Sequence, residues 1–211
     1  MKPPLRIGLT GNIGSGKSTV SHIFSTLGIP VYHADDESKK LLADPDVASE
    51  IVHRFGPGIL AGGSVDRKAL AAIVFSDSAS LRALNAILHP RVKQDFREWI
   101  TRHGGNPYVV QEAAILFESG FREEYHFVIN VSCPKETAID RVVKRDGVDG
   151  RLVLQRMQHQ MDDAEKSRLA DFVITNDGTR AVLPQVLALH EHLLQVCAQG
   201  DDDVAPGGTD A

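Results

Sequence analysis

Residues 11–19, Gly-Asn-Ile-Gly-Ser-Gly-Lys-Ser-Thr, have the types and spacing of a phosphate-binding loop. They fit the pattern G-x-x-x-x-G-K-[ST], whose glycines let successive backbone N–H groups face an anion. In this pattern Lys17 reaches the β- and γ-phosphates of a nucleoside triphosphate, and the hydroxyl of Ser18 holds Mg²⁺. The residues predicted to bind the nucleotide are therefore Asn12, Ile13, Gly14, Ser15, Gly16, Lys17, Ser18 and Thr19.

The segments on both sides of this loop have the patterns needed to position it. Residues 5–9 predict a short buried strand. Residues 18–27 carry apolar side chains at positions 20, 23, 24 and 27, which is the spacing of an amphipathic helix. The dipole of a helix that begins at the loop favours anion binding. A glycine-rich turn that matches by chance is the alternative, and the flanking strand and helix argue against it.

Short apolar runs alternate with helical patterns along the chain, which predicts βαβ units and a parallel sheet. The fold class is therefore α/β, with a five-stranded parallel sheet flanked by helices. A final helix is expected over 179–196. The predicted strands are 5–9, 30–32, 108–111, 127–131 and 172–175.

A long helical stretch separates the second and third predicted strands. Its helical patterns cover 46–55, 68–75, 78–88 and 90–102, with breaks at 55–64 and at His89-Pro90. We predict that residues 37–103 form a helical substrate domain and residues 141–165 a lid. The nucleotide-binding core would then consist of 1–36, 104–140 and 166–198, and residues 199–211 would form a disordered tail.

The composition is that of an ordinary globular chain, with 42% hydrophobic and 24% charged residues. No apolar run approaches the roughly 18 residues of a membrane helix, and no targeting segment precedes the first strand, so no membrane partner is expected. Cys133 and Cys197 are too few and too distant to predict a disulfide framework or a metal site. We expect a cytoplasmic protein that is a monomer or a weak homo-oligomer.

The net charge of −5 lies mostly in the tail, where four aspartates have no basic neighbour. Without them, 24 acidic residues stand against 23 basic ones, a difference of −1. A balanced body without a basic stripe argues against a nucleic-acid partner. The tail itself is rich in Gly and Asp, which predicts disorder.

Charged side chains elsewhere have two interpretations each. Arg141 and Arg145 share one face of a helix after the fourth strand, where they could neutralise a transferred phosphoryl group or belong to a solvated, salt-bridged face. Asp35 and Asp36 follow the second strand, at the edge of the sheet where ligands gather. Either could accept the proton of an attacking hydroxyl or cap the helix expected near Glu37.

The segment Leu9–Val20 resembles the opening of dephospho-coenzyme A kinases, a family of the P-loop kinase superfamily. Further motifs follow in the family's order, and the resemblance covers about residues 5–195. The phosphate loop alone is widely shared, but the ordered set is highly specific. The further motifs are Ala34-Asp35, Asp66-Arg67-Lys68-Ala69-Leu70 with Val74-Phe75, Leu88-His89-Pro90, Glu112 to Glu118, Arg141, Arg145-Asp146, Arg156-x-x-x-Gln160 and Asp171-x-Val173-Ile174-x-Asn176-x-Gly178.

The resemblance implies a P-loop kinase fold and a reaction that requires Mg²⁺. The γ-phosphate of ATP would be transferred to the ribose 3′-hydroxyl of dephospho-coenzyme A, the last step of coenzyme A biosynthesis. Asp35 would be the general base, and Lys17 and Arg145 would stabilise the transferring phosphoryl group. Arg141 would bind ATP from the lid, and Asn176 would lie near the adenine. The acceptor side would be lined by Asp35, Arg67, His89, Leu116, Phe117 and Glu118.

Structural interpretations of these motifs remain open. Leu88-His89-Pro90 could be a helix end, Leu116 and Phe117 could be core packing, Glu118 could be a surface carboxylate, and Asp66-Arg67 an ion pair. The chain also departs from the family at three places. Asn12 stands where glycine is usual, and His33 replaces the first Asp of Asp-Ala-Asp. Asp149-Gly150 occupies the lid turn, where many members of the family have a polar or basic residue.

Two other functions compete with this one. A nucleoside or nucleoside-monophosphate kinase would share the loop and the lid but take a smaller acceptor. A nucleotide-dependent switch would keep the loop and need neither Asp35 nor the lid arginines.

Overall fold

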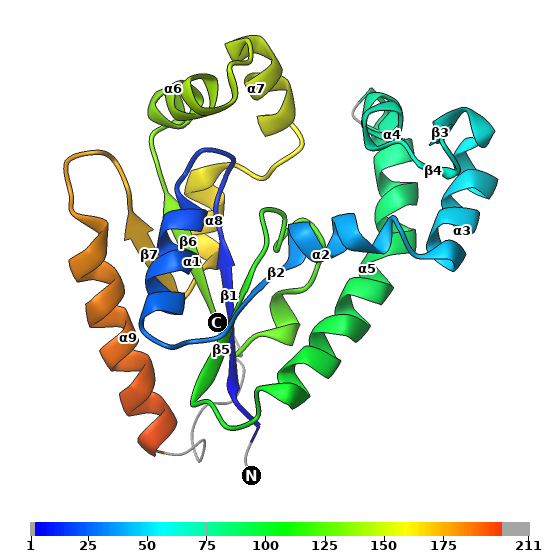
Figure 1. The fold of residues 1–211 in the computed structure, drawn as a ribbon. Coiled ribbons are helices and arrows are strands. Elements are labelled where there is room, and N and C mark those ends of the chain that lie inside the picture. The colour runs from blue at the N-terminus through cyan, green and yellow to red at the C-terminus, as the bar shows by residue number, and fades with distance from the viewer. Residues whose placement is uncertain (1–2, 75, 200–211) are drawn as a thin grey trace, which may run out of the picture. The chain divides into compact units, whose positions relative to one another are not determined.

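A computed structural model describes residues 3–74 and 76–199 of the chain (Figure 1). The predicted tail from residue 200 on, and Phe75, lie outside the described residues. The chain divides into two compact units, one made of the residues up to His33 and from His103 on, the other of Ala34–Arg102. None of the described helices is both long and apolar enough to span a bilayer.

The first unit is built on a five-stranded parallel sheet, as predicted. Each predicted strand is confirmed to within one residue at either end. The strand order is β2-β5-β1-β6-β7, so the strand that leads into the phosphate loop is the central one. The strands are β1 (Leu5–Thr10), β2 (Val31–His33), β5 (Tyr108–Glu112), β6 (Phe127–Ser132) and β7 (Phe172–Thr175).

Side-chain alternation along the strands separates the two faces of this sheet. Ile7 and Ile129 lie on the face covered by α1 (Lys17–Thr26) and α9 (Val182–Gln199), where Phe24 and Leu193 complete a fully buried cluster. Figure 1 shows α1 and α9 next to one another on that face. Asn130, one residue from Ile129, faces the opposite way and donates to Ser167 of α8 (Asp163–Leu169). Helices on both faces explain why most strand residues are apolar.

The final helix begins later than the predicted Thr179. Oδ1 of Asp177 accepts hydrogen bonds from the backbone N–H groups of Thr179 and Arg180, at 2.8 and 2.9 Å. These bonds hold residues 177–180 in a turn, and α9 starts only at Val182.

The second unit is mainly helical and has its own core. Val47, Ile51, Leu70 and Leu84 are among the buried side chains of this cluster. Asp44 accepts from the N–H groups of residues 46 and 47 and thereby caps α3. The elements are α2 (Ala34–Leu41), α3 (Pro45–Phe55), a 3₁₀ turn (Pro57–Ile59), the hairpin β3 (Leu60–Ala61) and β4 (Ser64–Val65), α4 (Arg67–Val74) and α5 (Ser78–Arg102).

The predicted break at His89-Pro90 is wrong, because α5 runs without interruption through Pro90. Proline removes one backbone donor from the helix and disturbs the turn before it. Here Nη1 of Arg91 donates to the carbonyl oxygen of Ile87 at 2.7 Å, and Nη2 donates to Glu50 of α3 at 2.6 Å. Buried Leu88 and Val92 lie on either side of the proline. The packing of these side chains on both sides of Pro90 therefore outweighs the local tendency of proline to break the helix.

Candidate functional site

The phosphate loop connects the central strand to α1, and its lysine is buried. Lys17 is 8% exposed, and its Nζ donates to the carbonyl oxygens of Gly11 at 2.8 Å and Asn12 at 3.4 Å. These bonds curl the loop around the ammonium group. With these carbonyls turned to the lysine, backbone N–H groups of the loop such as those of Gly14 and Gly16 can face an anion, whereas that of Ser15 donates to the carbonyl oxygen of Asn12 at 3.0 Å.

Two glycines of the loop are required by close neighbours as well as by backbone angle. Gly16 has φ +100° and Gly14 has φ +79°, both in the left-handed region. A Cβ at Gly16 would collide with the side-chain amide of Asn176, and one at Gly14 with the carbonyl of Ala138 in α6 (Lys135–Asp146). The loop is therefore packed between the turn after β7 and α6.

Polar atoms inside the loop lack partners. Oδ1 of Asn12 and Oγ of Ser15 are buried, and neither has a hydrogen-bond partner among the residues that the structure describes. Unsatisfied buried polar atoms are rare and call for an explanation such as a ligand. Ser18 and Thr19, at the first turn of α1, are exposed. The loop thus combines an anion cradle, a buried cation and an accessible hydroxyl.

Asn176 lies against the loop through its side chain. Its Nδ2 donates to the carbonyl oxygen of Ser15 at 2.7 Å, and its Oδ1 accepts from Arg141 at 3.2 Å. Arg141 also donates to the backbone oxygen of Asn176 at 3.2 Å and to Sγ of Cys133 at 3.4 Å. Arg141 and Asn176 therefore brace the loop, although the nucleotide-binding roles predicted for both remain predictions.

The two predicted lid arginines lie in different surroundings. Arg145, one turn beyond Arg141 on α6, is 62% exposed, and among the described residues it pairs with its neighbour Asp146 alone, at 2.6 Å. The hydrogen bond from Arg145 lowers the pKa of the Asp146 carboxyl. After a turn, α7 (Gly150–Met157) follows, capped by Asp149. Arg145 is accordingly the more available of the two for a ligand, because its present partner is exposed and easily exchanged.

Two ionisable side chains, His33 and Glu112, meet where β2 and β5 end. His33 and Glu112 are register partners on these strands, and Nδ1 of His33 lies 2.7 Å from Oε2 of Glu112. Asp35 follows two residues later. The helix expected near Glu37 begins at Ala34, so Asp35 and Asp36 lie in its first turn and are not its caps. Asp36 pairs with Lys39 at 2.6 Å and is exposed.

Residues 113–118, which we call the post-β5 loop, contain three predicted acceptor residues. Leu116 is 1% exposed and packs beneath Gly8, so it is a core residue. Phe117 is half-buried. Oε1 of Glu118 accepts from the backbone N–H of Met161 at 2.7 Å. The structure therefore gives Leu116 and Glu118 packing and positioning contacts, and their contact with an acceptor remains a prediction.

A fully buried lysine holds the same loop. Nζ of Lys166, on α8, lies 2.9 Å from Oε1 of Glu118 and donates to the carbonyl oxygen of Ala114 at 2.7 Å. Burial lowers the pKa of Lys166, and the carboxylate of Glu118 opposes that shift. No sequence pattern signals this lysine, because its partners are 48 and 52 residues away.

The second unit holds two further predicted acceptor residues. Arg67 begins α4 and donates from Nη2 to the carbonyl oxygen of Lys39, at the end of α2, at 3.0 Å. Asp66 does not form the ion pair that was the alternative interpretation of Asp66-Arg67 but caps α4, accepting from the N–H of Lys68 at 2.8 Å. His89 lies in the middle of α5 and is half-buried, and burial lowers its pKa.

One contact to the phosphate loop has no counterpart among the predicted binding residues. The backbone N–H of Ile13 donates to Oε1 of Gln160 at 3.0 Å, across 147 positions of sequence. Gln160 follows α7 and belongs to the lid motif Arg156-x-x-x-Gln160. Its contact with the loop is tertiary and could not be derived from spacing.

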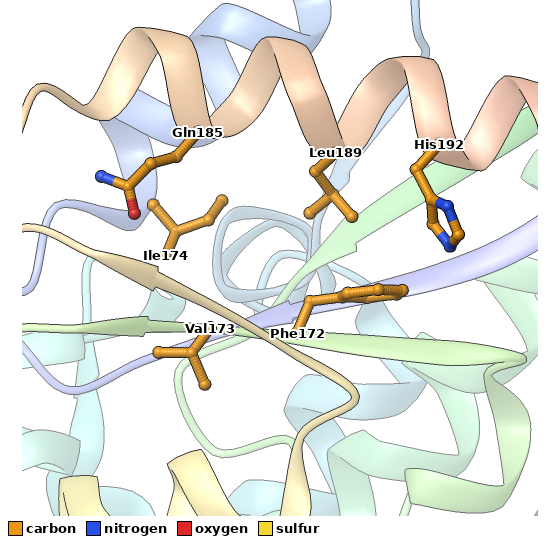
Figure 2. Close-up of a pocket in the computed structure, with 6 residues that line it drawn as sticks. All are labelled: Phe172, Val173, Ile174, Gln185, Leu189 and His192. Carbon is orange, nitrogen blue, oxygen red and sulfur yellow. The ribbon is translucent and has the colours of Figure 1, made fainter.

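A pocket of about 340 Å³ lies between β7 and α9. Figure 2 shows Gln185, Leu189 and His192 extending from α9 toward Phe172 and Ile174 of β7. It contains none of the predicted site residues. Nor does any group of three or more His, Cys, Asp or Glu side chains within residues 3–74 and 76–199 form a metal site.

Comparisons with family models and with curated proteins identify the same family. A family model described as dephospho-CoA kinase matches residues 5–181. A dephospho-CoA kinase of Bacteroides fragilis is 41% identical over 192 residues, which are 90% of this chain and 94% of that protein.

Solved structures agree with this comparison. The crystal structure of a Thermus thermophilus protein aligns with a TM-score of 0.82 at 37% identity, covering 90% of this chain and 98% of that one. A dephospho-CoA kinase from Campylobacter jejuni aligns with a TM-score of 0.67 at 28% identity and the same coverage. With its phosphate loop folded around a buried lysine and the family model spanning most of its length, the chain belongs to the dephospho-CoA kinase family.

Proposed function

We propose that this protein transfers the γ-phosphate of ATP to the ribose 3′-hydroxyl of dephospho-CoA, giving CoA and ADP. The observation that carries the proposal is the family match over residues 5–181 in a chain whose phosphate loop is folded for anion binding. Phosphoryl transfer asks the protein mainly to position groups and to neutralise charge. The residues described above are suited to both tasks.

On the ATP side, residues 12–19 would hold the phosphates through backbone N–H groups other than those of Ile13 and Ser15, which donate to Gln160 and Asn12. Lys17 would exchange its contacts with the loop carbonyls for the β- and γ-phosphates, and so stabilise charge on the transferring group. When the lid closes, Arg145 would leave Asp146 and contact the same transferring group. Arg141 and Asn176 would hold the loop and the nucleotide from the side of α6 and β7.

Mg²⁺ would enter as the complex with ATP. The fit rests on two observations of the loop, the exposed hydroxyl of Ser18 at the start of α1 and the unpartnered oxygens of Asn12 and Ser15. A hydroxyl oxygen is a suitable ligand for this hard cation. The ion would supply charge neutralisation between the β- and γ-phosphates.

On the acceptor side, Asp35 would accept the proton of the 3′-hydroxyl as it attacks the phosphorus. Its place two residues after β2 supports this role, because ligands of parallel sheets gather at the carboxyl ends of the strands. We further propose that residues 37–103 form the acceptor domain, with Arg67 and His89 among its binding residues, and residues 141–165 the lid. Phe117, Leu116 and Glu118 would complete the acceptor side.

The location and assembly of the protein are further proposals. We propose a cytoplasmic location. We propose a monomer or a weak homo-oligomer.

A coupled ADP-release assay tests the proposed reaction. The rate of ADP release by the purified protein with Mg²⁺ and ATP would be measured with dephospho-CoA, adenosine, AMP or CMP as the acceptor, and the four rates would be compared. We expect stimulation by dephospho-CoA alone, with CoA as the product and with no activity when EDTA removes Mg²⁺. The Lys17→Ala variant is the matched control and should lose turnover by orders of magnitude.

Stimulation by adenosine, AMP or CMP in place of dephospho-CoA would contradict the proposal. That result would identify a nucleoside or nucleoside-monophosphate kinase. Tight ATP binding without turnover on any acceptor would instead identify a nucleotide-dependent switch.

A further inference from the structure

One peptide unit of the phosphate loop is held from both of its ends. The carbonyl of Asn12 accepts from Nζ of Lys17 at 3.4 Å, and the N–H of Ile13, in the same peptide unit, donates to Oε1 of Gln160 at 3.0 Å. In a trans peptide these two groups point in opposite directions. The lysine that reaches the β- and γ-phosphates and the amide of Gln160 therefore flank one peptide of the anion cradle.

The orientation of the Gln160 amide follows from this contact. The N–H of Ile13 is a donor, so the atom that faces it must be the carbonyl oxygen of the side chain and not its NH₂ group. Because Nε2 is bonded to the same carbon as Oε1, the NH₂ group lies beside the same loop peptide. Nε2 has no acceptor among the residues that the structure describes. Two unused donors thus lie at the edge of the cradle.

The backbone that carries Gln160 is also fixed. The N–H of Gln160 donates to the carbonyl oxygen of Met157 at 3.0 Å, and the next N–H, of Met161, donates to Glu118 at 2.7 Å. Glu118 is held in turn by the buried Lys166 at 2.9 Å. Asp162 then caps α8 through the N–H of Ala164. The amide therefore stands on an anchored segment between α7 and α8, and little ordering is needed to use it.

We propose that Gln160 is a γ-phosphate-binding residue. Its Oε1 keeps the Asn12–Ile13 peptide oriented, and its Nε2 donates to an oxygen of the γ-phosphate when ATP fills the loop. A neutral donor here complements the cations Lys17 and Arg145 and adds directional hydrogen bonds. This assignment rests on the proposed function, because it requires the loop to hold a nucleoside triphosphate.

Binding of two nucleotides that differ in the γ-phosphate tests the assignment. Calorimetry with Mg²⁺ would compare ADP with β,γ-imido-ATP on the full chain, with no acceptor present. In Gln160→Met, which keeps the size of the side chain but removes both its donors and the acceptor of the Ile13 N–H, we expect ADP to bind no more than about threefold more weakly and β,γ-imido-ATP at least about 10-fold more weakly.

A second variant separates anchoring from phosphate binding. Gln160→Glu keeps an acceptor for the N–H of Ile13 but replaces the donors with a negative charge. We expect it to bind β,γ-imido-ATP more weakly than Gln160→Met does, with an unchanged thermal unfolding midpoint. The same changes at Gln155, exposed on α7, are the controls and should alter neither affinity.

Two results would overturn the assignment. An equal loss of ADP and β,γ-imido-ATP affinity would make Gln160 a structural anchor of the loop. Tighter binding of β,γ-imido-ATP by Gln160→Met would mean that the amide obstructs the phosphate. Because no acceptor takes part, these results stand even if dephospho-CoA is not the substrate.

Discussion

Fully buried Lys166 forms an ion pair with the more exposed Glu118, with Nζ 2.9 Å from Oε1, and the same ammonium group donates to the carbonyl oxygen of Ala114 at 2.7 Å. One side chain of α8 therefore holds both ends of the post-β5 loop. Glu118 also accepts from the N–H of Met161, within the segment predicted as the lid. The loop predicted to contact the acceptor and the segment that carries Gln160 are thus fixed by one pair.

Replacing Lys166 with Met should lower the free energy of unfolding by about 1–2 kcal/mol, because the change leaves the carbonyl oxygen of Ala114 and the Glu118 carboxylate without the hydrogen bonds of the ammonium group. Urea denaturation would measure the loss. Lys39→Met removes an exposed ion pair with Asp36 and is the control, with an expected change below about 0.5 kcal/mol. Equal stabilities for the two variants would contradict a structural role for Lys166.

Replacing Arg145 with Ala should separate activity from stability. Its partner Asp146 is a neighbour in sequence and the pair is exposed, so the unfolding midpoint should not change. Turnover should fall by about 100-fold or more, because a cation on the transferring phosphoryl group acts mainly in the transition state. Arg151→Ala, exposed on α7, is the matched control. Unchanged turnover in Arg145→Ala would remove this arginine from the site.

Replacing Asp35 with Asn should lower kcat by about 100-fold with little change in the KM for ATP, because the amide cannot accept the hydroxyl proton. Asp36→Asn makes the same chemical change one residue away, at an exposed ion pair, and should leave kcat within about twofold. Steady-state kinetics with dephospho-CoA would compare them. If both variants retained full turnover, another group would have to be the base.

His89 should make stability depend on pH. Burial lowers its pKa in the folded protein, so below about pH 6.5 the unfolded chain binds a proton that the folded chain resists. The unfolding free energy should be fully present above that pH and fall as the pH drops toward the lower folded value. Denaturation between pH 8 and pH 5 should show a shallower slope for His89→Asn, while His22→Asn, an exposed change on α1, should match the wild type. Parallel slopes for all three would contradict the burial effect.

Much of the fold follows from local patterns in the sequence. The phosphate loop is one contiguous motif, and the five strands are apolar runs bounded by turns, so neighbouring residues determine both. The predicted break at His89-Pro90 is wrong, because a prediction from neighbouring residues does not include the packing of the helix. Buried side chains on both sides of the proline, from Leu84 to Phe96, keep the helix continuous, and Arg91 adds a side-chain bond to the carbonyl oxygen of Ile87 in the turn before it.

The sequence by itself determined the nucleotide loop, the parallel sheet and the family, because each depends on residue types at fixed short spacings. The tertiary structure decided which side chains meet there. Gln160 contacts Ile13 across 147 positions, and Asn176 contacts Ser15 across 161. It also showed Arg141 bound to Asn176 while Arg145 remains exposed. Such contacts depend on how helices and loops pack around the sheet, and periodicity along the chain carries no information about them.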